Sequence, residues 1–118
     1  MALEERRKWW RTTAAPVSLM LRTLQPPWRE ESTVSQDLSE GGLRFTTLMP
    51  LAAGSLIELE MVLPFDSLPL CVESAIAWVR ERNVKGVPHF EVGARFVEMS
   101  APDRGRLHYY LTRAATAR

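Results

Sequence analysis

The sequence predicts a mostly β domain (β+α): a six-stranded antiparallel barrel with one C-terminal α-helix and an arginine-bearing N-terminal arm. Apolar residues alternate with polar ones in several short segments that turn residues separate, and the alternation gives way to a helical period after residue 99. The length of 118 residues suits one compact domain. Because strands this short and numerous hide their edges best by closure, we predict a barrel over residues 17–118 and an arm over residues 1–16.

The first half of the barrel is expected to hold three strands. Residues 17–24 carry apolar side chains at every second position and run into Pro26-Pro27, which predicts a strand and its end. The segment 28–36 is polar, and it leads into Asp37-Leu38-Ser39-Glu40-Gly41-Gly42, which has the composition of a tight turn. With the β-compatible residues 43–47 behind it, this composition predicts a hairpin that turns near residues 40–42.

Three further strands follow in the second half of the barrel. Residues 54–63 alternate between apolar side chains and glutamates, which is typical of a strand with one wet face. Residues 70–82 and 89–99 continue the pattern, with a turn-rich link over residues 83–88.

The C-terminal segment has the period of a helix. Leu107, Tyr110 and Leu111 follow i, i+3, i+4 spacing, and Ser100 with Asp103 three residues later is typical of an N-terminal cap. We therefore predict one helix over about residues 101–116, packed against the sheet.

Large apolar side chains in these strands are interpreted as core. Trp78, Phe90 and Phe96 are in phase with the alternation, so we expect them inside the barrel and not on a surface where bases stack. Cys71 lies in an apolar run and is interpreted in the same way. Trp9 and Trp10, on the arm, are left open: they either dock on the barrel or mark a protein contact.

Composition excludes several classes of protein. Fifteen Lys and Arg against 14 Asp and Glu give a net charge of +1, too balanced for a protein that coats nucleic acid by bulk charge, so no DNA or RNA partner is expected. The N-terminus has no apolar signal region, the apolar stretch 48–63 is interrupted, and the one cysteine excludes an intrachain disulfide. We expect a cytoplasmic protein without membrane insertion.

No enzymatic or metal constellation is evident in the sequence. His89 and His108 have no ligand-type spacing, and no GxSxG motif is present. We therefore predict a non-enzymatic protein with neither catalytic residues, metal nor cofactor.

Two short motifs remain to be explained. Arg7 and Arg11 form an RxxxR, and Asp37, Ser39 and Gly42 form a DxSxxG about 25 residues later. Taken alone, the first also fits a solvated basic arm. The second also fits a hairpin in which Asp37 and Ser39 cap backbone amides and the glycines adopt positive φ.

Taken together, these motifs resemble those of the PilZ domain family, small β-barrels that bind the bacterial second messenger cyclic di-GMP. The resemblance covers nearly the whole chain and continues in residues 54–59, 75–79, 92–99 and 103–107. Two positions depart from the family pattern: Ser74 stands where glycine is frequent, and Trp9-Trp10 make the RxxxR linker bulky.

The resemblance implies a site for cyclic di-GMP. Its residues here would be Arg6, Arg7, Arg11, Asp37, Ser39, Gly41 and Gly42. Arginine forks suit phosphates and the guanine O6 and N7 atoms, and a carboxylate suits the guanine N1–H and N2–H donors. Ser39 would bond a phosphate or a guanine edge, and Gly42 would let the backbone approach. Arg6 would favour a stacked nucleotide dimer, although a solvated side chain explains it nearly as well.

The predicted output is a change of protein contacts. We expect cyclic di-GMP to order the arm and so to alter binding of an unidentified effector protein in motility, biofilm or exopolysaccharide processes. The alternatives are a PilZ-type adaptor that binds no nucleotide and a small-barrel nucleic-acid-binding protein. Arg44 is left outside the predicted site, and the oligomeric state is left open.

Overall fold

The structure is a computed structural model that describes residues 16–64 and 66–116. The predicted arm residues Arg6, Arg7 and Arg11, together with Trp9 and Trp10, lie outside the described residues. The elements are β1 (Ser18–Thr23), β2 (Glu30–Leu38), β3 (Gly42–Thr47), β4 (Leu56–Val62), β5 (Leu70–Val84), β6 (Val87–Met99) and α2 (Ala101–Thr116).

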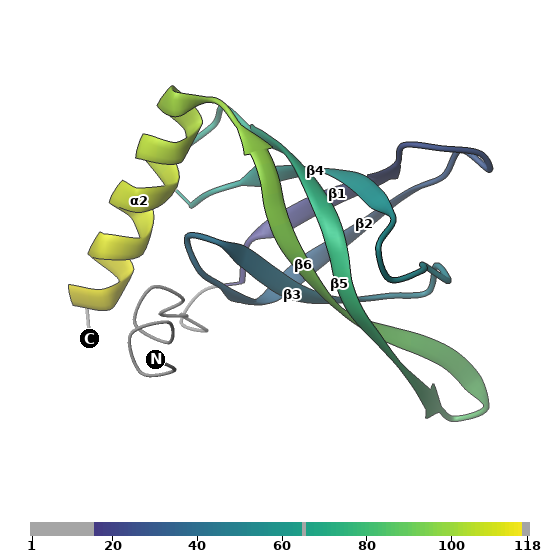
Figure 1. Cartoon of the computed structure of the whole chain (residues 1–118). Helices are drawn as coiled ribbons and strands as arrows, with labels where there is room; N and C mark the ends of the chain where they lie inside the picture. The colour runs from purple at the N-terminus through teal and green to yellow at the C-terminus, as the bar shows by residue number, and fades with distance from the viewer. Residues whose placement is uncertain (1–15, 65, 117–118) are drawn as a thin grey trace, which may run out of the picture.

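The six strands form a closed antiparallel barrel with the order β1-β2-β3-β6-β5-β4 (Figure 1). This confirms the predicted fold class and the hairpin between β2 and β3. The order also brings β3, β6 and β5 side by side, although β3 is distant from the other two in the sequence. That neighbourhood positions the site described below.

Alternation of apolar side chains fills the barrel. On β4, Ile57, Leu59 and Met61 are buried and the intervening glutamates are half-buried, as the period of two requires. The largest fully buried side chain of the described residues is Phe45 of β3. Phe90 and Phe96 are half-buried against this core, which agrees with their predicted place.

Helix α2 begins and packs as its sequence predicts. The Ser100 Oγ accepts a hydrogen bond from the Asp103 backbone N–H at 3.2 Å, which caps the first turn. Leu107 and Leu111 are buried in the same core cluster as the barrel residues. The helix thus covers the barrel with the face that its apolar period defines (Figure 1).

The β5–β6 hairpin is longer than predicted. Residues 83–88 were expected to be a link, but the strands continue and pair as far as Val84 opposite Val87. Lys85 and Gly86 alone form the turn, with φ of 51° and 82°. A two-residue turn with both φ positive matches the right-handed twist of the strands, so the hairpin stays regular and projects from the barrel, away from α2 (Figure 1).

Two residues predicted to be core face outward. Ile76 pairs with Ala94 and Trp78 with Gly93, so Ala77 is an extra residue, a β-bulge that reverses the alternation. Trp78 is consequently 39% exposed, and its predicted core position is wrong. Cys71 is also exposed, because it alternates with the buried Leu70 and Val72.

Candidate functional site

The turn between β2 and β3 is built around Ser39. Its side chain is fully buried, accepts hydrogen bonds from the N–H groups of Gly41 (3.3 Å) and Gly42 (3.2 Å), and donates to the Gly42 carbonyl (3.1 Å). The Ser39 N–H also donates to that carbonyl at 2.9 Å. The hydroxyl that the sequence assigned to a ligand is therefore engaged in closing the turn.

Gly42 is required because β3 approaches β6 closely. A Cβ at this position would lie 2.2 Å from the carbonyl oxygen of Ala94 and 3.3 Å from the Arg95 Cα, both backbone atoms. Gly42 is not among the described residues with positive φ, so close approach and not turn conformation explains it.

The turn also forms hydrogen bonds with β6 and α2. The Gly41 carbonyl accepts a hydrogen bond from the Phe96 N–H at 2.8 Å, and Glu40 Oε2 lies 2.6 Å from His108 Nδ1 on α2. Contacts with β6 and α2 thus hold the loop that carries the motif.

Asp37, at the end of β2, is paired with an arginine on the next strand. Its Oδ2 accepts a hydrogen bond from Arg44 Nε at 3.1 Å, and the other end of the guanidinium lies 2.5 Å from Glu91 Oε2 on β6. Burial opposes the charge on Arg44, but the hydrogen bonds that its guanidinium donates to Glu91 and Asp37 outweigh this effect and raise the pKa of the guanidinium above its ordinary value. Arg44 therefore stays charged and bridges three strands.

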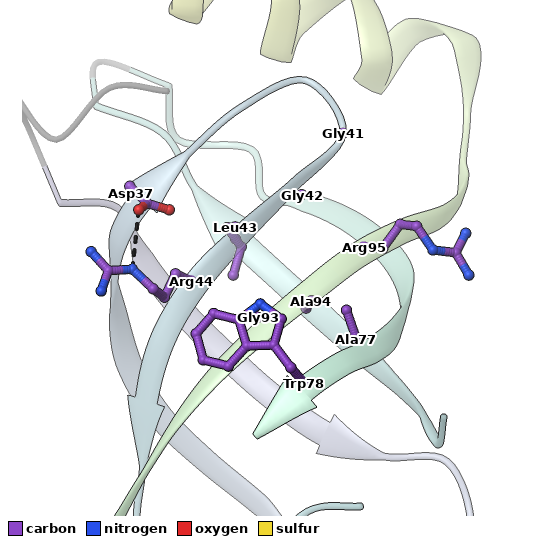
Figure 2. Close-up of a pocket in the computed structure, with 10 residues that line it drawn as sticks. All are labelled: Asp37, Gly41, Gly42, Leu43, Arg44, Ala77, Trp78, Gly93, Ala94 and Arg95. Atoms are coloured by element: carbon purple, nitrogen blue, oxygen red, sulfur yellow. Dashed lines mark hydrogen bonds and ion pairs between the residues drawn. The ribbon is translucent and has the colours of Figure 1, made fainter. Parts of the chain in front are cut away.

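A pocket of about 350 Å³ opens beside this ion pair on the outside of β3, β6 and β5. We call it the outer pocket; its lining includes Asp37, Gly41, Gly42, Arg44, Trp78 and Arg95. Figure 2 shows the Trp78 indole lying over Gly93, with Arg44 beside it and the Arg95 side chain directed to the opposite side. A Cβ on Gly93 would lie 2.2 Å from Trp78 Nε1, so this glycine makes room for the ring.

The outer pocket combines three kinds of chemistry. A carboxylate accepts hydrogen bonds, guanidinium groups supply charged donors, and a partly exposed indole offers a flat apolar face. The pocket is at the small end of the usual range for ligand sites, about 300–1,000 Å³. Such a set suits a ligand with a planar ring, N–H donors and negative charge.

A family model of the PilZ domain matches residues 5–113. The chain belongs to the PilZ domain family. The six-stranded barrel, the DxSxxG turn and most of α2 all lie within the matched PilZ region.

Several solved structures share the fold. The chain is 21% identical to the PilZ domain of Escherichia coli YcgR with c-di-GMP, with a TM-score of 0.71 over 96% of this chain and 95% of that one. It is 22% identical to the Bacillus subtilis inhibitor of motility MotI/DgrA, with a TM-score of 0.72 over 96% and 53% of the two chains. For the MrkH–c-di-GMP complex of K. pneumoniae, the identity is 16% and the TM-score 0.70, over 95% and 53%.

The chain therefore spans about half the length of MotI and MrkH. Comparison with curated protein sequences found no match.

The structure brings part of the predicted site together. Asp37, Gly41 and Gly42 line the outer pocket, Ser39 lies buried beneath it, and the arm arginines fall outside the described residues. Sequence reasoning missed Trp78 and placed Arg44 outside the site. The sequence holds no decisive signal for Trp78: it is followed by Val79, and two adjacent large apolar residues cannot both face the core of a regular strand, but this pattern does not say which of them faces outward.

The helix among the described residues is too short and polar to cross a membrane. Within the same part of the chain, no three His, Cys, Asp or Glu side chains are grouped so as to hold a metal ion.

Proposed function

We propose that this PilZ domain is a non-enzymatic receptor for cyclic di-GMP and that it binds the nucleotide at the outer pocket. The observation that carries the proposal is the convergence of Asp37, Arg44 and Trp78 from three strands on one pocket beside the DxSxxG turn. Structural neighbours crystallised with c-di-GMP, YcgR and MrkH, support the choice of ligand. We also propose that the protein is cytoplasmic, as the sequence predicts.

Asp37 is the proposed guanine reader. A carboxylate accepts N1–H and N2–H of guanine in parallel, and no other natural base presents that pair of adjacent donors. In this structure Asp37 accepts a hydrogen bond from Arg44, so a bound guanine would either share the Asp37 carboxylate with Arg44 or displace Arg44 from it. A displaced Arg44 would remain charged through Glu91 and would stay close enough to meet a phosphate.

Trp78 and the arm complete the proposed site. The indole is exposed over Gly93 and gives a guanine ring a face on which to stack. We propose that Arg7 and Arg11 close over the nucleotide from the arm and pair with its phosphates, with Arg6 as a further contact.

Ser39 and Gly42 act on the ligand indirectly in this proposal. Ser39 holds the turn closed through its own backbone contacts, and Gly42 lets β3 lie against β6. Together they fix the position of Asp37 and of the Gly41 backbone at the rim of the pocket.

The proposed output is a changed contact with another protein. The similar B. subtilis protein is described as an inhibitor of motility, which supports an output through contact with another protein. We propose that nucleotide binding orders the arm and changes a partner-binding surface, in motility or a related surface behaviour.

Calorimetric titration with cyclic di-GMP tests the proposal. We expect Asp37→Ala, Arg7→Ala and Arg11→Ala each to weaken binding about ten- to a hundredfold, since each removes a charge-assisted hydrogen bond contributing about 1.5–3 kcal/mol. Glu98→Ala and Arg104→Ala, at exposed positions on β6 and α2, are the matched controls and should bind like the wild type. Unchanged affinity in all three site variants would overturn the site, and absence of binding by the wild type would favour the adaptor that binds no nucleotide.

A further inference from the structure

The outer edge of β5 is open along part of its length within the part of the chain that the structure describes. Pairing between β4 and β5 ends at Leu56 opposite Ala75, and Ile76 makes the last hydrogen bonds on that side, with Gly54 and Ser55. β5 nevertheless continues to Val84, paired over this stretch with β6 alone among the described strands. Residues 77–84, which we call the free edge, extend about 27 Å at about 3.4 Å per residue.

The free edge carries positive charge toward solvent. Arg80 and Arg82 alternate along it with 64% and 59% of their side chains exposed, and both lie within 4 Å of Glu91, which is only 7% exposed. Arg44 contacts the same carboxylate. Glu91 is thus shared by three guanidinium groups, of which Arg44 also pairs with Asp37, so Arg80 and Arg82 keep unpaired donors and positive charge at the surface.

A second copy of the chain meets like charges when the pairing is centred on any of residues 80, 81 and 82. If two free edges pair antiparallel with Glu81 at the centre, Glu81 of one copy faces Glu81 of the other, and Arg80 faces Arg82. If the centre is Arg80 or Arg82, that arginine faces the same arginine of the other copy. Like charges directly opposite one another destabilise a sheet. A strand with carboxylates at alternate positions would instead meet both arginines while its backbone bonds the edge.

We propose that the free edge of β5 is a docking strand for an extended acidic segment of a partner protein. The segment adds to the sheet as a further strand, with carboxylates facing Arg80 and Arg82 and an apolar side chain beside Val84, which is 46% exposed. This inference rests on the proposed function only for the idea that the output is a protein contact.

The docking strand adjoins the outer pocket. Arg80 lies over the Trp78 ring with its guanidinium carbon 5.7 Å from the ring centre, and Glu91 links Arg80 to Arg44 beside Asp37. A ligand that draws Arg44 toward itself changes the pairing of Glu91 and hence the charge that Arg80 and Arg82 present. Nucleotide and partner are therefore coupled through one buried carboxylate.

Fluorescence anisotropy with a synthetic peptide tests the docking strand. The probe is a labelled peptide of alternating Glu and Val, compared with a Lys-Val peptide and with a Glu-Val peptide N-methylated at alternate residues. We expect the Glu-Val peptide to bind the full chain at least tenfold more tightly than either, because one lacks the carboxylates and the other the backbone donors. Arg80→Glu with Arg82→Glu should abolish this preference, and Arg104→Glu on α2 is the matched control.

Three results would overturn the docking strand. These are equal peptide binding by the Arg80/Arg82 and Arg104 variants, equal binding of the N-methylated probe, and self-association through this edge that the peptide does not reverse. Cyclic di-GMP titration of the same proteins reports on the proposed function separately. Peptide binding without nucleotide binding would refute the receptor and support the docking strand, and the reverse result would refute the docking strand alone.

Discussion

Replacement of Gly42 by alanine should force β3 away from β6. The new Cβ would lie 2.2 Å from the Ala94 carbonyl oxygen, whereas ordinary contact begins at 3.4 Å, so the strands must separate locally by about 1.2 Å. The obstructing atoms belong to the backbone and cannot rotate away. Overpacking of this kind costs about 1–3 kcal/mol. For a domain of this size, that predicts a melting temperature lower by about 4–12 °C.

Thermal unfolding followed by circular dichroism measures this effect, with Gly105→Ala as the matched control. A Cβ on Gly105 meets nothing within 4 Å, and alanine is the better helix former by about 1 kcal/mol, so this variant should be as stable as the wild type or more stable. The same change of residue thus has opposite expected signs at two sites. A melting temperature for Gly42→Ala within about 2 °C of the wild type would refute the argument from close approach.

Three further predictions concern the turn, the pocket and the thiol. Ser39→Ala should lower the free energy of unfolding by about 1–3 kcal/mol without nucleotide, because buried backbone donors lose their acceptor; unchanged stability in urea unfolding, with lost affinity, would show direct ligand contact instead. Gly93→Ala should displace the Trp78 ring and weaken cyclic di-GMP binding in calorimetry while costing less stability than Gly42→Ala, since the obstructing atoms belong to an exposed side chain; equal affinity would exclude Trp78 from the site. Burial raises the pKa of the Cys71 thiol, and so does the negative charge of Glu60, whose Oε2 lies 3.9 Å from the sulfur. Glu60→Gln should therefore lower that pKa and speed alkylation of the thiol by iodoacetamide at pH 8. An unchanged rate would contradict the electrostatic cause.

The elements that the sequence predicted well depend on local patterns. Alternation along β4 and the Ser100 cap of α2 involve residues within a few positions of one another, and both appear in the structure as expected. The length of the β5–β6 hairpin was underestimated because Lys85-Gly86 forms a tighter turn than the composition of residues 83–88 indicates. The place of Trp78 was wrong because a bulge is set by the register against β6, which no single-strand pattern contains.

The candidate site divides in the same way. The DxSxxG motif is contiguous, so Asp37, Gly41 and Gly42 could be assigned to one location from spacing alone. Arg44 and Trp78 reach that location only because the barrel order sets β3 and β5 on either side of β6. Tertiary neighbours of this kind follow from the closed topology and not from the distance between residues in the chain.

The residues of the DxSxxG motif differ in what they do: some hold the fold, and one is available to contact a ligand. Ser39 and Gly42 satisfy the backbone of the turn and the packing of β3 on β6, so this barrel uses them whether or not it binds a ligand. Asp37 is different: it is 8% exposed, it lines the pocket, and its charge is balanced by an arginine that also serves Glu91. A buried carboxylate paired with a half-buried arginine adds little net stability to a strand end, because desolvation of the carboxylate offsets much of their attraction. Asp37, Arg44 and Trp78 are therefore the described positions at which the proposed nucleotide binding can be distinguished from folding. Substitutions there should separate affinity from stability in a way that Ser39 and Gly42 cannot.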